Sequence, residues 1–370
     1  MKILIIGALP QSLLNFRGQL IKDIHTKGHE IIAMAAPAEQ NTIDQIEELG
    51  CRYQSFPIQR NGLNPLSDIK TLFALIKIIK KEQPDIVFSY TVKPIVWGGI
   101  AARFFSKAKF YGLITGLGFA FQQQQKNRKL INFIVTNLYK QALSKATAVI
   151  FQNPDNQHVF IENGIIPLEK TFRVNGSGVD TKHFVKSPLP ITSSTTFLTI
   201  ARLLGDKGII EFYQAAKLVK TRYPNTHFQI LGPADPSPDG IKLSEVMKWH
   251  DDKEITYLGE TDDVRPFINN CHIFVLPSYH EGMPRTVLEA MATGRPILTT
   301  NVPGCKETVD DGLNGFLVEK QNYQSLADKM IYLLDNQDSW NSMAEHSYDK
   351  VIKSFTIEQV NQHLLHILKL

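Results

Sequence analysis

The chain has 370 residues, of which 43% are hydrophobic, 21% charged and 9% aromatic. At roughly 100–200 residues per domain, this length predicts two domains and excludes a single small binding module. The composition excludes wholesale disorder and predicts an ordinary globular protein. Three widely separated cysteines without CxxC spacing argue against a disulfide framework or a structural zinc site and favour a reducing cytosol.

The N-terminus, MKILIIG, has one charge and an apolar run too short for the core of a signal peptide. No later stretch approaches ~18 uninterrupted apolar residues, the length that spans a membrane. We therefore expect a cytoplasmic protein that is neither exported nor membrane-spanning.

Charge is distributed unevenly between the two halves. Residues 1–185 contain 22 Lys/Arg against 13 Asp/Glu, whereas residues 186–370 contain 18 against 23. A basic half can serve an anionic partner such as nucleic acid, an acidic membrane surface or a phosphorylated substrate. The alternative is a solvated basic face without a partner.

Short apolar runs alternate with amphipathic stretches along the chain. Residues 2–7 predict a strand, followed by a loop and a helix near residues 16–27. A segment rich in Pro, Ser and Thr at residues 187–194 predicts a linker, after which the alternation restarts. The pattern predicts a parallel sheet on each side of the linker, with ligands bound in a cleft beyond the carboxyl ends of the strands. Further strands are predicted at residues 30–34, 85–89, 197–200, 227–231, 255–258, 273–276 and 296–300.

The strongest constellation is PSYHEGMPRTVLEAMA, residues 277–292, in which a strand end runs through a loop into a helix with Pro284 in its first turn. The free amides at the start of that helix suit a phosphate or another anion. Glu281 in the loop and Glu289 in the helix can accept hydrogen bonds from hydroxyl groups on either side of that anion. A sugar nucleotide fits this description. Alternatively, Glu281 is a dipole-stabilised carboxylate and Glu289 a solvated helix residue, although its apolar neighbours argue against solvation.

Residues 281–289 match the Glu-seven-residues-Glu motif of the family 4 retaining glycosyltransferases, enzymes of the GT-B fold. ARLLGDKG, residues 201–208, resembles the family's Arg-Leu and Lys-Gly motif after the first strand of the nucleotide-binding domain. NGSGVD, residues 175–180, resembles its interdomain element with two inserted residues, and residues 303–318 resemble the segment that follows the glutamates. The resemblance covers essentially the whole C-terminal half.

This resemblance implies an α/β protein of GT-B fold, with two Rossmann-like parallel-sheet domains facing across a cleft. Residues 1–185 would bind the acceptor and residues 186–352 the nucleotide sugar. A final helix within residues 353–370 would cross back to the first domain.

The resemblance also implies the roles of individual residues. Arg202 and Lys207 would clasp the donor diphosphate and neutralise charge on the leaving nucleotide, and Glu281 would contact the transferred sugar. Glu289 would accept hydrogen bonds from the ribose. Taken singly, each cation is more simply a charged surface residue, and Gly232 and Gly259 are as easily turn residues. The remaining donor-binding candidates in this half are Gly282, Met283, Arg285, Gly232, Gly259 and Glu260.

The N-terminal half departs further from the family pattern. Its first loop, GALPQSLLNFR at residues 7–17, lacks the glycine pair of many members, so Asn15 is a weaker donor-binding candidate. ITGLGF, residues 114–119, has no histidine where some relatives place one. Thr115 and the backbone around Gly116 and Gly118 would then line the sugar site, or the segment is simply a turn. Together with TVKP at residues 91–94, this element resembles bacterial enzymes that elongate lipid-linked surface glycans.

A polyprenyl-diphosphate-linked acceptor would explain the basic N-terminal half. Residues 68–83 place apolar side chains at helical spacing with lysines on other faces, and residues 103–110 and 126–145 mix basic and apolar side chains again. Such helices can rest on anionic lipid, on the inner face of the cell membrane. Alternatively, they cover the sheet with their apolar stripes inward.

The sequence contains no GxGxxG after its first strand, no Walker motif and no HExxH. A dinucleotide-binding domain, a Walker-type triphosphatase and a metal cluster are therefore disfavoured. The expected reaction is metal-independent, needs no cofactor beyond the nucleotide sugar and involves no nucleic acid. The resemblance implies retaining transfer of a hexosyl or N-acetylhexosaminyl group, with UDP-N-acetylhexosamine the first choice, to a lipid-linked glycan in surface polysaccharide biosynthesis. Two alternatives are a nucleotide-sugar 2-epimerase of the same fold and a non-enzymatic sugar-nucleotide sensor at the membrane.

Overall fold

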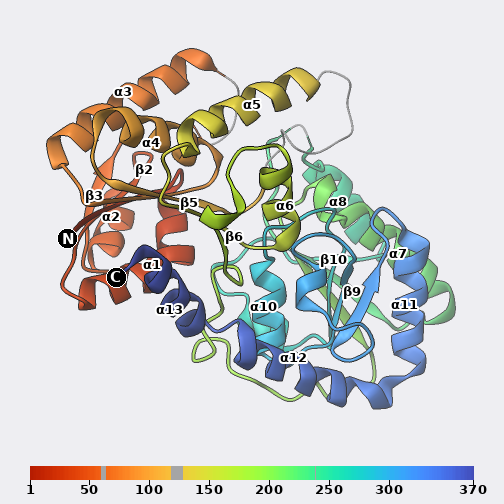
Figure 1. The fold of residues 1–370 in the computed structure, drawn as a ribbon. Helices are drawn as coiled ribbons and strands as arrows, with labels where there is room; N and C mark the ends of the chain where they lie inside the picture. The colour runs from red at the N-terminus through yellow and green to blue at the C-terminus, as the bar shows by residue number, and fades with distance from the viewer. Residues whose placement is uncertain (60–63, 118–127, 238) are drawn as a thin grey trace. The chain divides into compact units, whose positions relative to one another are not determined.

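The computed structural model describes residues 1–59, 64–117, 128–237 and 239–370 (Figure 1). These residues form two compact units, each built on its own parallel sheet. The first unit comprises Met1–Ser177 together with Val360–Leu370, and the second comprises Gly178–Gln359. The predicted α/β architecture with two Rossmann-like parallel sheets is confirmed.

In the described part of the first unit, seven strands form one sheet in the order β3-β2-β1-β4-β5-β6-β7, and all neighbours run parallel. The central strands are buried almost without interruption, because helices cover both faces of the sheet. The strands are β1 (Lys2–Ile6), β2 (Glu30–Ala35), β3 (Arg52–Ser55), β4 (Ile86–Tyr90), β5 (Lys109–Ile114), β6 (Ala148–Phe151) and β7 (Thr171–Arg173).

Helices α3, α4, α5 and α6 bury apolar residues against one face of this sheet, and α1, α2 and α13 cover the other (Figure 1). Although α13 comes last in the sequence, its Leu364 is fully buried in the core of the first unit. Its Asn361 also donates a hydrogen bond to Asp23, at 2.7 Å. These helices are α1 (Pro10–Thr26), α2 (Gln40–Glu47), α3 (Pro65–Glu82), α4 (Val92–Phe105), α5 (Arg128–Leu143), α6 (Pro154–Glu162) and α13 (Ile357–Leu368).

The second unit repeats this plan with a six-stranded parallel sheet in the order β10-β9-β8-β11-β12-β13 over the described residues. One core lies under α7, α8 and α11, and another lies under α9, α10 and α12. The strands are β8 (Thr196–Ile200), β9 (His227–Leu231), β10 (Thr256–Tyr257), β11 (Ile273–Leu276), β12 (Ile297–Thr300) and β13 (Gly315–Val318). The helices are α7 (Ile209–Arg222), α8 (Leu243–Asp251), α9 (Arg265–Asn269), α10 (Arg285–Ala292), α11 (Tyr323–Asp335) and α12 (Trp340–Ser354).

Both strand orders reverse at one place, between β1 and β4 in the first sheet and between β8 and β11 in the second. Connections leave toward opposite faces at such a point, which opens a crevice at the carboxyl ends of the two strands. In the second unit, the loops that follow β8 and β11 carry the motifs singled out from the sequence.

Three boundaries differ from those predicted. Helix α1 begins at Pro10 rather than near residue 16, because the fixed backbone of proline suits a first helical turn. The division falls after Ser177 rather than after residue 185, since Val179 donates to the Phe355 carbonyl at 2.9 Å and belongs to the second core. The C-terminal segment expected at residues 353–370 begins with the last two residues of α12, and the final helix expected within it is α13.

No helix within the described ranges has both the length and the apolar character needed to cross a bilayer.

Candidate active site

The loop after β8 carries the first predicted motif, residues 201–208. Leu203 and Leu204 are buried and anchor the loop, which continues as one 3-10 turn, Gly205–Lys207. Gly208 then starts α7 with φ +70°, a left-handed conformation. A Cβ at this glycine would lie 2.1 Å from the carbonyl oxygen of Pro277. The lack of a side chain therefore allows the loop to touch the loop after β11.

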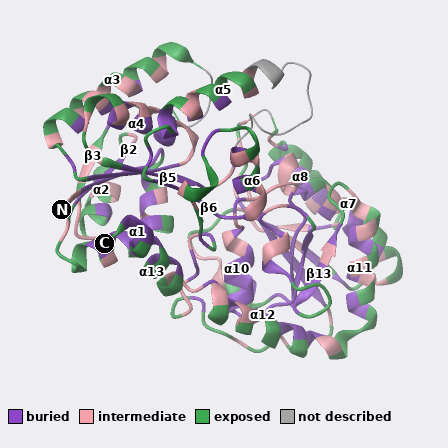
Figure 2. Cartoon of the chain, in the orientation of Figure 1, coloured by how far each residue is buried: buried purple, intermediate pink, exposed green. Residues whose placement is uncertain are grey.

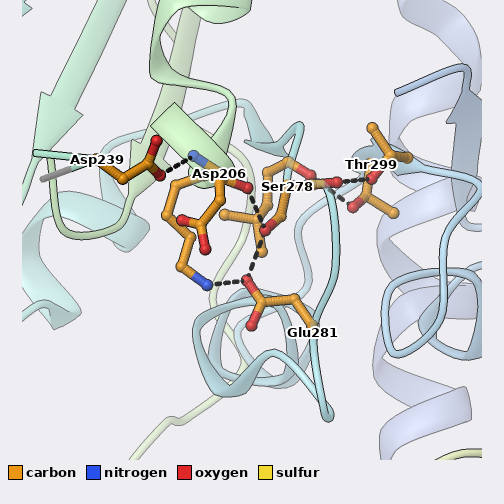
Figure 3. A network of polar contacts seen from close by, with 8 residues as sticks. Asp206, Asp239, Ser278, Glu281 and Thr299 are labelled. Atoms are coloured by element: carbon orange, nitrogen blue, oxygen red, sulfur yellow. Dashed lines mark hydrogen bonds and ion pairs between the residues drawn. The ribbon is translucent and has the colours of Figure 1, made fainter. Parts of the chain in front are cut away.

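Hydrogen bonds join these two loops across the point where the strand order reverses (Figure 3). The carbonyl oxygen of Asp206 accepts from the backbone N–H of Tyr279 at 2.8 Å and from the hydroxyl of Ser278 at 3.1 Å. Ser278 is fully buried, and the hydroxyl of Thr300 donates to its carbonyl. These hydrogen bonds thus hold the loops after β8 and β11 together as one structure.

Lys207 and Glu281 meet within this structure. The ammonium of Lys207 lies 2.6 Å from Oε1 of Glu281, and each side chain is 16% exposed. The single hydroxyl proton of Ser278 is shared between the Asp206 carbonyl and this carboxylate oxygen, which lies 2.8 Å from the hydroxyl. Burial by itself lowers the pKa of Lys207, but the charge and hydrogen bond of Glu281 outweigh burial, so the pKa is raised. The lysine therefore stays cationic.

Arg202, the second predicted cation, precedes the turn and is bonded through Nη1 to Asp235. Its side chain remains 39% exposed, whereas that of Asp235 is 9% exposed. Both predicted diphosphate-binding cations therefore come from the β8–α7 loop, and each is held by a carboxylate from a different loop.

Glu289 lies in α10 and is 6% exposed, so the solvated alternative is wrong. Its carboxylate pairs with Nε of Arg285, the first residue of the helix, at 2.8 Å. Burial raises the pKa of Glu289 to about 7, and Arg285 counteracts only part of this effect. Pro284 is the N-cap residue rather than part of the first turn. The candidates that precede the helix are the buried Gly282 and the half-buried Met283.

This pKa predicts a pH-dependent stability. The folded-state value of about 7 exceeds the usual 4.5, so the bound proton stabilises the fold fully below about pH 4.5, and this contribution is lost as the pH rises through 7. Relative to Glu289→Gln, the wild type should lose about 3 kcal/mol of unfolding free energy between these limits. Urea unfolding of both proteins across this range measures the difference, and parallel pH profiles would contradict the prediction.

Gly232 and Gly259, which follow β9 and β10, are brought together by the 2.7 Å hydrogen bond from the Gly232 N–H to the Gly259 carbonyl. A Cβ at Gly232 would lie 2.0 Å from the Ala201 carbonyl, so the loops after β8 and β9 also approach closely. The Gly259 position is open, and Glu260 is exposed beside it.

Asn15 and Thr115 belong to the first unit. Asn15 is exposed on α1, so it is a helix residue rather than part of the first loop, which is only residues 7–9. Thr115 directly follows β5 and is half-buried. A Cβ at Gly116 would meet nothing within 4 Å, and Gly118 lies outside the described residues.

Three residues that hold the predicted side chains in place do not stand out in the sequence. Ser278 and Asp206 lie inside the quoted motifs, but their roles depend on contacts between loops. Asp235 lies in PADPSPDG, residues 233–240, whose concentration of Pro and Asp is the only sequence signal. Within the described ranges, no group of His, Cys, Asp and Glu could hold a metal ion.

A doubly wound sheet whose loops present cations and carboxylates where the strand order reverses is typical of a nucleotide-binding site. Comparison with known proteins gives the family. Residues 194–336 match the model described as glycosyl transferases group 1, and residues 2–153 match the model described as glycosyl transferase 4-like. The chain belongs to this glycosyltransferase family and is an enzyme of that class.

Curated relatives extend the match. An N,N'-diacetylbacillosaminyl-diphospho-undecaprenol alpha-1,3-N-acetylgalactosaminyltransferase of Campylobacter jejuni is 29% identical, over 91% of this chain and 90% of the relative. A UDP-Gal:alpha-D-GlcNAc-diphosphoundecaprenol alpha-1,3-galactosyltransferase of Escherichia coli is 27% identical, over 81% and 79%. HepE of Anabaena in complex with UDP and glucose has a TM-score of 0.80 at 19% identity, over 100% and 99% of the two chains, which supports the fold.

Proposed function

We propose that this glycosyltransferase moves an N-acetylhexosaminyl or hexosyl group from a nucleoside-diphosphate sugar to a polyprenyl-diphosphate-linked glycan. UDP-N-acetylhexosamine is the first choice of donor. The observation that carries the proposal is the Lys207–Glu281 pair, held at 2.6 Å where the loops after β8 and β11 meet. An ammonium at this place matches a diphosphate, and a carboxylate matches the hydroxyl groups of the attached sugar.

In this proposal, the two cations act on the leaving group. As the glycosidic bond breaks, negative charge accumulates on the diphosphate, and Lys207 and Arg202 stabilise that charge more strongly than they stabilise the ground state. Glu281 fixes the sugar through its hydroxyl groups and also holds Lys207 in place. Glu289 accepts hydrogen bonds from the ribose, a role that favours its ionised form.

The names of the relatives support the acceptor and the stereochemistry. Both specify an undecaprenyl diphosphate carrier and an alpha-1,3 linkage, and the Escherichia coli enzyme is named for UDP-Gal. Because the sugar of UDP-galactose is alpha-linked to the diphosphate, an alpha product retains the anomeric configuration. We propose the same retaining outcome here, by departure and attack on one face of the sugar, without a covalent carboxylate intermediate.

The test is an incubation of labelled UDP-N-acetylhexosamine with and without a polyprenyl-diphosphate-linked sugar. Label should enter the lipid fraction only with acceptor present, should persist in excess chelator and should disappear in Glu281→Gln. A C2 epimer formed without acceptor would support the epimerase alternative instead. Melting temperatures measured with UDP-, GDP- and ADP-sugars identify the donor, since a tight ligand stabilises the fold. If none raises the melting temperature, the proposed function is wrong.

We also propose that the first unit rests on an anionic membrane surface through α3, α4 and α5, which pack side by side (Figure 2). Large apolar side chains on these helices face solvent: Leu66 is 72% exposed, Phe73 66%, Phe104 59% and Phe133 66%. The α3 stripe expected from the sequence is therefore only partly directed inward. Ile79 packs in the core, whereas Ile69 joins the exposed group.

Exposed lysines accompany these apolar side chains. Lys70 and Lys77 share a face of α3 with Leu66 and Phe73 by helical spacing, and the ammonium of Lys80 lies 4.8 Å from the centre of the Phe105 ring in α4. An apolar face edged by lysines suits the boundary between headgroups and acyl chains.

Lys70→Gln/Lys77→Gln should weaken binding to vesicles that contain phosphatidylglycerol by about 10- to 30-fold, since each basic side chain near anionic headgroups contributes about 1 kcal/mol. Vesicle co-sedimentation at low salt measures the effect. Lys248→Gln/Lys353→Gln removes two exposed lysines of the second unit and is the matched control. Equal losses in both variants, or unchanged binding in the first, would contradict this surface.

A further inference from the structure

The loop after β9 is fastened along the donor loop that follows β8. The backbone N–H of Leu203 donates to the Pro233 carbonyl at 2.9 Å, and that of Gly205 donates to the Asp239 carbonyl at 3.0 Å. The carboxylate of Asp239 also accepts from the N–H of Asp206, at 2.9 Å, as Figure 3 shows. These bonds lie on both sides of Asp235 in its loop and directly follow Arg202 in the other, so they limit the freedom of both backbones.

Asp235 is the member of this loop that touches a predicted donor-binding side chain. One of its carboxylate oxygens accepts from Nη1 of Arg202, and the other accepts from the N–H of Ser237 at 2.9 Å. Burial raises the pKa of Asp235, but the hydrogen bonds from Ser237 and Arg202 outweigh burial and lower it. The carboxylate is therefore a charged, fixed partner.

We propose that Asp235 is a positioning residue that presents Arg202 to the donor diphosphate. A guanidinium has five N–H donors in a rigid fork, so a carboxylate at Nη1 leaves other donors for phosphate oxygens. Arg202 is 39% exposed, and without Asp235 it would sample several side-chain conformations. Asp235 thus reduces the conformational entropy lost on donor binding. This inference rests on the proposed role of Arg202 in binding the diphosphate.

The opposite role, competition with the diphosphate for Arg202, requires Asp235 to withdraw when the donor binds. The backbone bonds from Leu203 and Gly205 to the Asp235 loop resist that movement. A fixed support therefore fits the contacts better than a displaceable inhibitor does, and the two roles predict opposite changes in affinity.

The experiment titrates UDP, and GDP as a second probe, into the full chain by calorimetry. Asp235→Ala should raise the Kd of the bound nucleotide and the KM of its sugar up to about tenfold, the range expected when one long side chain must be ordered on binding. Asp235→Asn keeps one acceptor oxygen, which can still accept from Arg202 but not also from the Ser237 N–H, and it should recover part of this loss. In a protein that already carries Arg202→Ala, Asp235→Ala should cause no further loss of nucleotide affinity, because Asp235 acts through Arg202.

Three results would overturn the proposal. Tighter nucleotide binding by Asp235→Ala would identify a competitor. If Asp235→Ala lowers nucleotide affinity equally in the wild type and in Arg202→Ala, Asp235 is a purely structural residue. Failure of Asp235→Asn to recover any affinity would lead to the same conclusion. The proposed function fails separately if wild type binds neither nucleotide, or if Arg202→Ala alone leaves nucleotide affinity and transfer unchanged.

Discussion

Lys207→Ala should lower kcat/KM for glycosyl transfer by about 100- to 1,000-fold, the usual effect of removing one charge-stabilising group from an active site. Lys207 is a retained cation, because Glu281 and its hydrogen bond raise the lysine pKa in spite of burial. Most of the loss should appear in kcat, since the charge that Lys207 opposes grows as the bond to the leaving diphosphate breaks. Initial rates at varied donor concentration measure the two parameters.

Two further variants make this prediction specific. Lys217→Ala removes an exposed lysine from the same part of the chain and should leave the rates unchanged. Glu281→Gln keeps the size of the side chain but removes its charge, so Lys207→Ala/Glu281→Gln should lose much less than the product of the two single losses. Independent, multiplicative losses would mean that the two residues do not act as the pair seen in the structure. Thermal melts establish that each variant is folded.

Gly208→Ala should destabilise the protein by about 2–4 kcal/mol, from left-handed backbone strain together with overpacking. The backbone at this glycine has φ +70°, and the added Cβ would lie 2.1 Å from the carbonyl oxygen of Pro277. Backbone atoms cannot rotate out of the way, so the loops after β8 and β11 must separate. Donor affinity should fall as well, because the separated loops would carry Lys207 and Glu281.

Gly312→Ala serves to separate the effect of the close contact with Pro277 from the effect of backbone strain. Its φ is +81°, but a Cβ there meets nothing within 4 Å. This variant should therefore lose only about 1 kcal/mol, the ordinary cost of a left-handed alanine. Urea unfolding compares the two variants with wild type. Similar midpoint shifts for both would contradict the argument that Gly208 is required by contact with Pro277.

The alternation of apolar runs and amphipathic stretches predicts much of the fold. Residues 227–231 and 273–276 are strands with the predicted bounds, because short buried strands in a parallel sheet need continuous apolar runs. The amphipathic pattern predicts the start of α1 too late, because it begins after Pro10, although proline is favourable at a first helical position. No local pattern shows that residues 178–185 belong to the second unit, because only long-range contacts such as that of Val179 with Phe355 place them there.

The candidate site likewise contains residues that the sequence predicts and residues that it does not. Lys207 and Glu281 were predicted as members of one donor site, and the structure brings them to 2.6 Å although 74 positions separate them in the sequence. Ser278, which holds the same carboxylate, was not predicted, because serine is common in loops and its spacing carries no signal. Asp235 was missed for a similar reason, since its bond to Arg202 joins two loops that follow different strands.

By itself, the sequence determined the periodicity of strands and helices, the donor motifs and the order in which they follow the strands. These properties are local, because they depend on side-chain chemistry and spacing within about 20 residues. The tertiary structure alone decided which carboxylate holds which cation, how deeply Glu289 is buried and which loops touch through Gly208. Those features arise where the strand order reverses, and a parallel sheet brings distant strands together there through pairings that no local pattern encodes.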